Sequence, residues 1–264
     1  MGRRESYAPG TFCAVDLAAD DPAAAKDFYG ALFGWDPEDV PGPDGTTYTI
    51  LRLDGDVVAG LFERRPEQRE AGMPPSWINY VSVEDADAAA SKASELGGET
   101  LREPFDIADV GRMAVVRDPT GASLAVWQAG TFAGAARVNE PGCLTWNELA
   151  TNDTAGALIF YNGLFGWVTE EMEAGDGPPY TIIRVGERSN GGARRLTPDE
   201  ERAGAPPHWL PYFAVESIDA TIARCGSLGG QKLFGPSDFP AGRIAALRDA
   251  QGAAFALWEG ELQD

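Results

Sequence analysis

Two carboxylates stand at matching places in two apolar segments of the chain. Asp16 lies within residues 11–17 and Glu148 within residues 144–149, and the composition of both segments is typical of β-strands. Burial raises the pKa of a carboxyl group, so either residue could act as a general base near neutral pH or bind a cationic ligand. Each could equally be a structural carboxylate that bonds to a backbone amide or an arginine at a strand end.

Aromatic and arginine side chains also recur in pairs, at a spacing of 131 or 132 residues. The pairs are Tyr80 with Tyr212, Trp77 with Trp209, Trp127 with Trp258, and Arg112 with Arg243. Large aromatic side chains can stack on a flat ligand, but they are as common in cores and domain interfaces. The two arginines could pair with the two carboxylates or bind an anionic ligand. We therefore treat all eight as candidate ligand-binding residues with a structural alternative.

This spacing belongs to a repeat that runs through the whole sequence. The segment FYGALFGW at residues 28–35 returns as FYNGLFGW at residues 160–167, an offset of 160 − 28 = 132. Repeats of a few tens of residues indicate solenoids or propellers, whereas one this long indicates two whole domains in tandem. We predict domains at residues 9–129 and 143–261, joined by a small-residue, turn-rich linker at 130–142.

The charge of the chain excludes some classes of partner, and its cysteine content indicates a cellular compartment. The chain has 21 basic and 41 acidic side chains, a net charge of −20, which would repel nucleic acid and an anionic membrane surface. An apolar run of membrane-spanning length is missing, so we expect no membrane association. The three cysteines are far apart and odd in number, which indicates a reducing, cytoplasmic location.

Each predicted domain shows the same order of elements twice: a strand, a helix and three further strands. Asp21-Pro22 is typical of a helix start, and apolar residues at 28, 31, 32 and 35 give that helix one apolar face. The charged, proline-bearing stretch 64–75 is predicted to be a loop. We therefore predict an α+β fold of four βαβββ modules.

Three motifs resemble those of the vicinal oxygen chelate superfamily, which includes glyoxalase I, extradiol dioxygenases and bleomycin-resistance proteins. The motifs are Asp21-Pro22, the repeated aromatic segment at 28–35, and the Asp-Pro-Thr-Gly sequence at 118–121. The two-domain build looks most like actinobacterial glyoxalase-like proteins often labelled hydroxylases. The resemblance implies that two modules pair into a curved mixed sheet around a cavity.

Metal-dependent members of that superfamily carry histidine and glutamate ligands on strand positions that face the cavity. The matching positions here hold Ala14, Ile78 and Ala125 in the first domain, and Trp146, Leu210 and Ala256 in the second. None of these side chains can donate a lone pair to a divalent ion. We therefore predict no metal and no other cofactor, and we count Trp146 among the candidate ligand-binding residues.

Strand periodicity places Asp16 on the same face as Ala14, toward the expected cavity. Three hypotheses follow. The first is a glyoxalase-like protein that binds a small organic molecule without the family metal site. The second is a metal-independent lyase, isomerase or hydrolase with Asp16 or Glu148 as general base. The third is an acidic protein-interaction module. We expect a monomeric pseudo-dimer or a homodimer.

Overall fold

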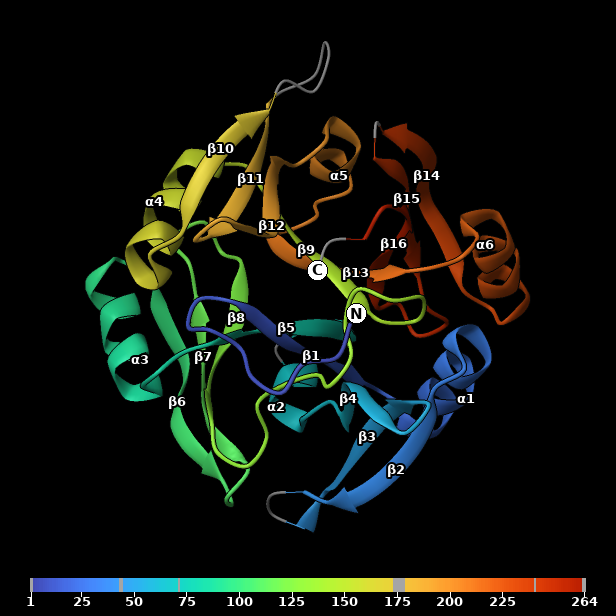
Figure 1. The fold of residues 1–264 in the computed structure, drawn as a ribbon, viewed down its shortest axis with the longest axis horizontal. Coiled ribbons are helices and arrows are strands. Elements are labelled where there is room, and N and C mark those ends of the chain that lie inside the picture. The colour runs from blue at the N-terminus through green and yellow to red at the C-terminus, as the bar shows by residue number, and fades with distance from the viewer. Residues whose placement is uncertain (1, 43–44, 71, 173–178, 240, 263–264) are drawn as a thin grey trace.

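The computed structural model describes residues 2–42, 45–70, 72–172, 179–239 and 241–262. Its strands form two eight-stranded sheets, one from each half of the chain (Figure 1). The first half contains β1 (Phe12–Ala19), α1 (Pro22–Phe33), β2 (Asp36–Pro41), β3 (Thr47–Leu53), β4 (Asp56–Glu63), α2 (Pro66–Glu70), β5 (Ser76–Ser82), α3 (Ala86–Glu95), β6 (Glu99–Ile107), β7 (Gly111–Arg117) and β8 (Ser123–Ala129).

The second half repeats this order. It contains β9 (Leu144–Thr151), α4 (Thr154–Phe165), β10 (Val168–Met172), β11 (Tyr180–Val185), β12 (Arg188–Arg195), α5 (Pro198–Arg202), β13 (His208–Ala214), α6 (Ile218–Ser227), β14 (Gln231–Phe239), β15 (Gly242–Arg248) and β16 (Ala254–Gly260). Setting α2 and α5 aside, the elements fall into four βαβββ modules. The predicted fold class is confirmed.

Two modules join edge to edge to make each sheet. The strand order in the first sheet is β2-β3-β4-β1-β5-β8-β7-β6, and the second sheet has the equivalent order. The junction is the antiparallel pair β1–β5, in which Ala14 lies opposite Tyr80 and Asp16 lies opposite Ile78. β4 runs parallel to β1 on the other side, with Gly60 opposite Asp16. The two central strands thus carry residues from both modules on one concave face.

Local sequence signals start and stop the helices. The Asp21 side chain accepts hydrogen bonds from the backbone N–H groups of Ala23 and Ala24, and Gly34 ends α1 in the left-handed conformation at φ 77°. Asp153 and Gly166 do the same for α4. These caps satisfy backbone groups that the first and last turns of a helix leave without partners.

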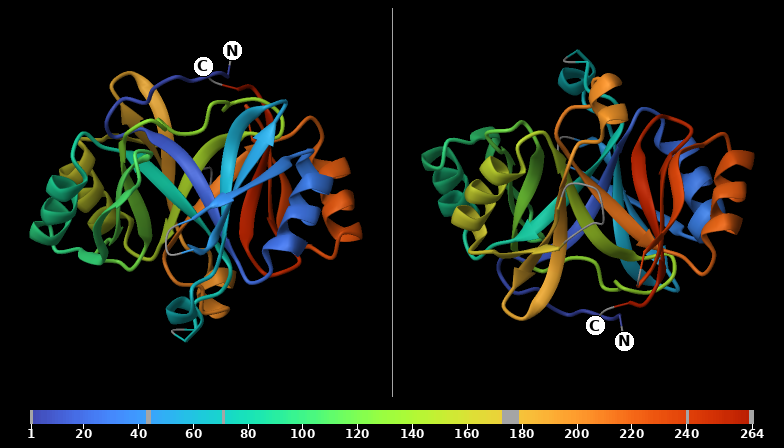
Figure 2. Two further views of the ribbon diagram at one scale, coloured as in Figure 1. Left: turned by 90° about the horizontal axis from the view of Figure 1, so that it is seen from below. Right: turned by 90° about the horizontal axis from the view of Figure 1, so that it is seen from above.

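One prediction for a connecting segment is wrong. The stretch 64–75, expected to be a loop, contains the short helix α2, and the equivalent α5 follows β12. A proline begins each helix, which suits the first helical position because that residue needs no N–H donor there. Both helices project from the face of the molecule opposite the chain termini (Figure 2).

The two domains pack through the repeated aromatic segment. Helix α1 lies beside α6, and α3 lies beside α4, so each helix pair combines one helix from each domain (Figures 1 and 2). The Trp35 indole N–H donates to the Gly142 carbonyl oxygen at 2.8 Å, and the Trp167 indole donates to the Gly10 carbonyl oxygen at 2.7 Å. Each domain therefore binds the segment that precedes the first strand of the other.

A tyrosine of the same segment reaches across the domain boundary. The Tyr29 hydroxyl donates to Asp249 Oδ2 at 3.0 Å and accepts from the Trp77 indole N–H at 3.2 Å. Asp249 Oδ1 meanwhile accepts from three backbone N–H groups of the turn before β16. All three side chains are buried.

Among the described residues, every helix is too short or too polar to span a membrane.

We predict that Tyr29→Phe lowers the free energy of unfolding by about 1–3 kcal/mol, because it leaves a buried carboxylate oxygen of Asp249 without its donor. Urea unfolding at pH 7, followed by tryptophan fluorescence, measures the change. Ile159→Ser, on the exposed face of α4, should alter the same quantity by no more than about 0.5 kcal/mol. Equal effects from both substitutions would contradict the proposed interdomain contact.

Candidate functional site

The carboxylate of Asp16 is clamped between two tyrosine hydroxyls. Its Oδ1 accepts from Tyr48 and its Oδ2 accepts from Tyr80, both at 2.9 Å. Tyr48 comes from β3 and Tyr80 from β5, which lie on opposite sides of β1 in the sheet. Gly60 lies between, and a Cβ there would collide with the Tyr48 hydroxyl and with Asp16 Oδ1. The glycine in β4 is thus what allows the hydrogen bond to form.

Burial dominates the electrostatics of this group. Asp16 is only 8% exposed, and loss of solvation raises its pKa to about 6 even though both tyrosines stabilise the charged form. Burial and the nearby carboxylate raise the pKa of Tyr48 and of Tyr80 well above the usual range. Both hydroxyls therefore stay protonated and act as donors, while Asp16 titrates close to neutral pH.

Asp16, Tyr48 and Tyr80 all line a cavity of about 350 Å³. The rest of its wall is mostly apolar, with Ala14, Val58 and Ile50 on the sheet. Trp127 closes one side, with ring contacts to Tyr80 at 6.2 Å and to Phe132 at 6.1 Å between centroids. The volume is near the lower end of the range of about 300–1,000 Å³ that is usual for small-molecule sites.

The connection between the domains covers this cavity. Thr131, Phe132 and Ala135 all contribute to the wall. The Trp127 indole N–H donates to the Phe132 carbonyl oxygen at 3.0 Å, and the Tyr7 hydroxyl donates to the Ala135 carbonyl oxygen at 2.6 Å. The segment expected only to join two domains is therefore part of the first cavity.

The matching carboxylate of the second domain has different surroundings. Glu148 is 5% exposed; its Oε2 accepts from the Tyr180 hydroxyl at 3.0 Å, and its Oε1 accepts from Arg194 Nε at 2.7 Å. Arg194 also donates to both carboxylate oxygens of Glu200, at 2.7 and 2.8 Å. The Trp146 indole N–H donates to the Tyr180 hydroxyl at 2.9 Å, so its ring lies against this network.

Two substitutions between the repeats account for the difference. Trp146 occupies the position of Ala14, which lines the first cavity, and Arg194 occupies the position of Phe62 (194 − 62 = 132). The registers confirm this correspondence, because Gly192 lies opposite Glu148 as Gly60 lies opposite Asp16. The second sheet thus places an indole and a guanidinium where the first has a methyl group and a phenyl ring.

The other predicted aromatic residues lie in three places: at the first cavity, in the second sheet and in the interdomain cores. Trp127 and Tyr80 lie at the first cavity. In the second sheet, Tyr212 lies against Glu148, and the Trp258 indole N–H donates to the Glu261 carbonyl oxygen at 3.0 Å.

Trp77 and Trp209 lie elsewhere. They are buried in the interdomain cores, where Trp77 contacts Tyr29 and Trp209 contacts Tyr161. Strand periodicity places Trp77 on the face of β5 opposite Tyr80. This position favours the structural alternative for both tryptophans.

The two predicted arginines, on β7 and β15, pair with carboxylates of helices: Asp87 of α3 and Asp219 of α6. Arg112 binds Asp87 through two hydrogen bonds, of 2.6 and 2.9 Å, and binds Asp106 at 2.9 Å. Arg243 binds Asp219 at 2.9 Å. The expected pairing of Arg112 with Asp16 and of Arg243 with Glu148 is therefore wrong: Asp16 bonds to tyrosines, and Arg194 holds Glu148.

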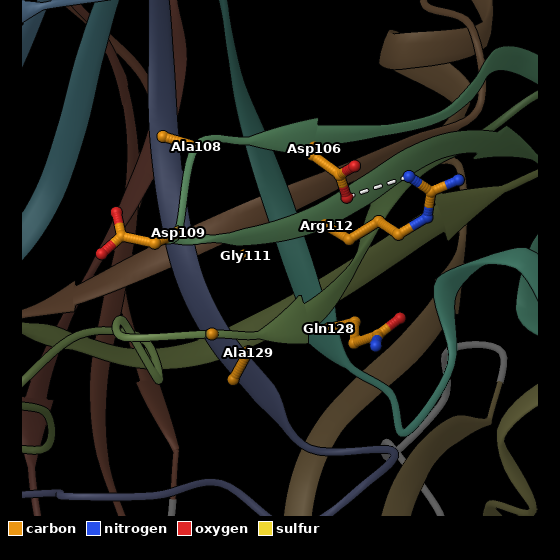
Figure 3. A pocket seen from close by; sticks show the side chains of 8 residues that line it. Asp106, Ala108, Asp109, Gly111, Arg112, Gln128 and Ala129 are labelled. Carbon is orange, nitrogen blue, oxygen red and sulfur yellow. Dashed lines mark hydrogen bonds and ion pairs between the residues drawn. The ribbon is translucent and has the colours of Figure 1, made fainter.

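Arg112 borders a second, shallower hollow of about 210 Å³ at the β6–β7 turn (Figure 3). Asp106 comes from β6, Asp109 from the turn and Gln128 from β8. The guanidinium of Arg112 is already engaged by two carboxylates. The hollow is open to solvent and does not reach Asp16.

Sequence reasoning missed the residues that complete the carboxylate site. Tyr48 and Tyr180 are themselves 132 residues apart, so the repeat offset contained the signal. Gly60 and Gly192 share that spacing, and in each case a Cβ would collide with the tyrosine hydroxyl. The role of Phe132 carried no such signal, because it depends on where the connection lies in space.

Each sheet has eight strands and is built from two βαβββ modules, and the first sheet curves around a cavity. This arrangement defines a class of folds in which ligands bind inside the cavity. The family model for the glyoxalase/bleomycin resistance protein/dioxygenase superfamily matches residues 12–126 and again residues 144–257. The chain belongs to this superfamily. The predicted resemblance is confirmed in both domains.

Relatives of full length share the two-domain arrangement. The chain is 42% identical over 259 residues to a Mycobacterium bovis protein named "Putative glyoxylase CFP32", with 97% of each chain covered. It is 35% identical over 263 residues to the anthracycline biosynthesis protein DnrV of Streptomyces peucetius, covering 96% of this chain and 94% of the relative.

Solved structures of low sequence identity share the fold. A Mn(II)-bound glyoxalase from Novosphingobium aromaticivorans superposes with a TM-score of 0.66 at 16% identity, over 100% of this chain and 85% of the other. The 2,3-dioxygenase LapB from Pseudomonas sp. KL28 gives a TM-score of 0.64 at 14% identity, over 97% and 95%.

The family metal does not fit the residues of this chain. The three positions of the first domain lie on the adjacent strands β1, β5 and β8 and hold Ala14, Ile78 and Ala125. Both oxygens of Asp16, a carboxylate on the same strand as Ala14, accept tyrosine hydrogen bonds. No group of three His, Cys, Asp or Glu side chains in the described part of the chain is arranged to hold a metal ion.

The raised pKa of Asp16 predicts a pH-dependent cost to stability. The folded state retains the proton up to about pH 6, whereas the unfolded state releases it near the ordinary value of 3.8. The cost is absent below about pH 4 and reaches its full size, on the order of 3 kcal/mol, above about pH 6. We expect the stability of Asp16→Asn relative to wild type to increase by about 1 kcal/mol between pH 5 and pH 8.

Urea unfolding of both proteins across this pH range tests the expectation. Glu148→Gln is the matched control in the second domain. It should lower the free energy of unfolding at pH 8 by about 1–3 kcal/mol, because it removes a partner from Arg194. A pH-independent difference between Asp16→Asn and wild type would mean that Asp16 titrates as an ordinary carboxyl group.

Proposed function

We propose that this protein binds a small, largely apolar organic molecule in the cavity of its first domain. The observation that carries the proposal is the cavity of about 350 Å³, whose mostly apolar wall contains the hydrogen-bonded group of Asp16, Tyr48 and Tyr80. Small-molecule sites typically combine such walls with a few polar groups that fix the orientation of the ligand.

The nature of the walls favours a flat ring system. Trp127 and Phe132 present aromatic surfaces, and aromatic side chains favour stacked or edge-on contacts with a planar ligand. DnrV is named as an anthracycline biosynthesis protein, and anthracyclines are fused-ring aromatic compounds. This supports the same ligand class for the present chain.

The second domain suggests the substitution that tests the proposal. Ala14→Trp places in the first cavity the side chain that the second domain has at the matching position, Trp146. We expect it to weaken binding of 2-naphthylmethanol, a neutral two-ring probe with one hydroxyl, by at least about tenfold, because the indole fills the binding volume. Isothermal titration calorimetry measures the affinity.

Ala88→Trp is the matched control. It makes the same change of side chain on the exposed face of α3, away from the cavity, and should leave the affinity unchanged. Ala14→Leu should give a smaller loss than Ala14→Trp. Equal binding by wild type and Ala14→Trp would place the probe outside this cavity and would contradict the proposal.

A second candidate function is acid–base catalysis in the same cavity. The observation that favours it is the pKa of Asp16, which burial raises to about 6, close to the value that suits a general base near neutral pH. A carbonyl or epoxide substrate with an acidic C–H group would lose its proton to Asp16.

For such a substrate, we predict that kcat/KM rises as Asp16 loses its proton and levels off above an apparent pKa of about 6. Asp16→Asn should lower kcat by about 10²–10⁴-fold while the substrate still binds. Steady-state rates between pH 5 and pH 8 test both statements. Binding without turnover in the wild type would leave the binding function and remove the catalytic one.

The third hypothesis, an interaction module with an acidic surface, rests on net charge alone. The arrangement of Asp16, Tyr48 and Tyr80 inside a cavity gives it no support.

A further inference from the structure

The two domains stabilise a buried carboxylate in different ways. Each buries one carboxylate at the same place on its central strand, 8% exposed for Asp16 and 5% for Glu148. Removing a charge from water is costly unless an opposite charge or several hydrogen bonds replace the solvent. Glu148 has an opposite charge from its own chain, because Arg194 lies 2.7 Å away.

Asp16 has no such partner. Its hydrogen-bond partners are the neutral hydroxyls of Tyr48 and Tyr80, and no salt bridge within the described part of the chain includes it. The position that would supply the matching arginine holds Phe62. The first domain therefore has the buried anion and an adjoining cavity, whereas the second has the anion and a built-in cation.

We propose that the ligand of the first domain is a protonated aromatic amine whose ammonium group pairs with Asp16 and thus takes the place that Arg194 fills in the second domain. This inference rests on the proposed binding function and specifies its ligand class. Each Asp16 oxygen accepts one tyrosine hydrogen bond and keeps further acceptor capacity, and Asp16 is part of the cavity wall.

The cavity walls suit a cation as well as a ring. Tyr80, Trp127 and Phe132 are aromatic, and the faces of such rings attract ammonium groups through cation–π interactions. Among the described residues of the wall, Arg52 is the one basic residue, and its guanidinium pairs with Glu38 at 2.7 Å. The net charge of −20 further favours the approach of a cation over that of an anion.

A neutral ligand with a hydroxyl group is the alternative, because it could also donate to Asp16. Comparing two probes of the same shape separates these possibilities. 2-Naphthylmethylamine is a cation at pH 7.5, and 2-naphthylmethanol is its neutral counterpart. We expect the wild-type protein to bind the amine at least about tenfold more tightly than the alcohol, because a charge-assisted hydrogen bond replaces a neutral one.

Variants identify the group responsible for this preference. Asp16→Asn should bind both probes with similar affinity. The double substitution Asp16→Glu with Phe62→Arg reproduces the second-domain pair and should likewise remove the preference. Asp153→Asn, which removes one carboxylate at the exposed cap of α4 where asparagine still caps, should keep it.

The outcomes distinguish the two proposals. Equal affinities of the wild type for amine and alcohol, with both lost in Ala14→Trp, would overturn the amine proposal and leave the binding function intact. Binding of neither probe would overturn both. A preference for the amine that persists in Asp16→Asn would show that another group recognises the charge and would also overturn the inference.

Discussion

The first cavity depends on the antiparallel pairing of β1 with β5. It joins two modules that are separate in sequence and sets Asp16 beside Tyr80 on one concave face. The parallel pairing of β1 with β4 adds Gly60, which leaves room for the hydroxyl of Tyr48. Because side chains alternate along a strand, a shift of one residue in either pairing would turn the carboxylate away from the cavity.

Because the domain is duplicated, the surroundings of the buried carboxylate can be compared between the two sheets. Both sheets retain a buried carboxylate with two tyrosines beside it, and the second sheet adds Trp146 and Arg194. The arginine neutralises Glu148, while the indole packs beside it. The first sheet keeps Ala14 and Phe62 at these positions, so its carboxylate faces open volume. The two domains thus differ at the same place in the fold: the second has an ion pair, and the first has the proposed binding site.

The repeated aromatic segment has a structural role outside the cavity: it packs the two domains together. Tyr29, Trp35 and Trp77 form part of a buried aromatic cluster that includes Phe213 of the other domain. Hydrogen bonds from Trp35 and Trp167 attach each domain to the chain segment that enters the other. The same packing places residues 131–135 across the first cavity. The position of the wall and the docking of the domains are therefore linked.

The sequence alone determined the tandem repeat, the four βαβββ modules and the pair of carboxylates, because these depend on local periodicity, helix caps and the spacing between copies. It also determined that the family metal positions hold side chains without lone pairs. Only the tertiary structure decided that Arg112 binds Asp87 rather than Asp16, and that Trp77 packs in the core. It alone placed Phe132 in the cavity wall. These outcomes depend on which strands become neighbours and how two domains dock, and such long-range contacts leave no periodic signal along the chain.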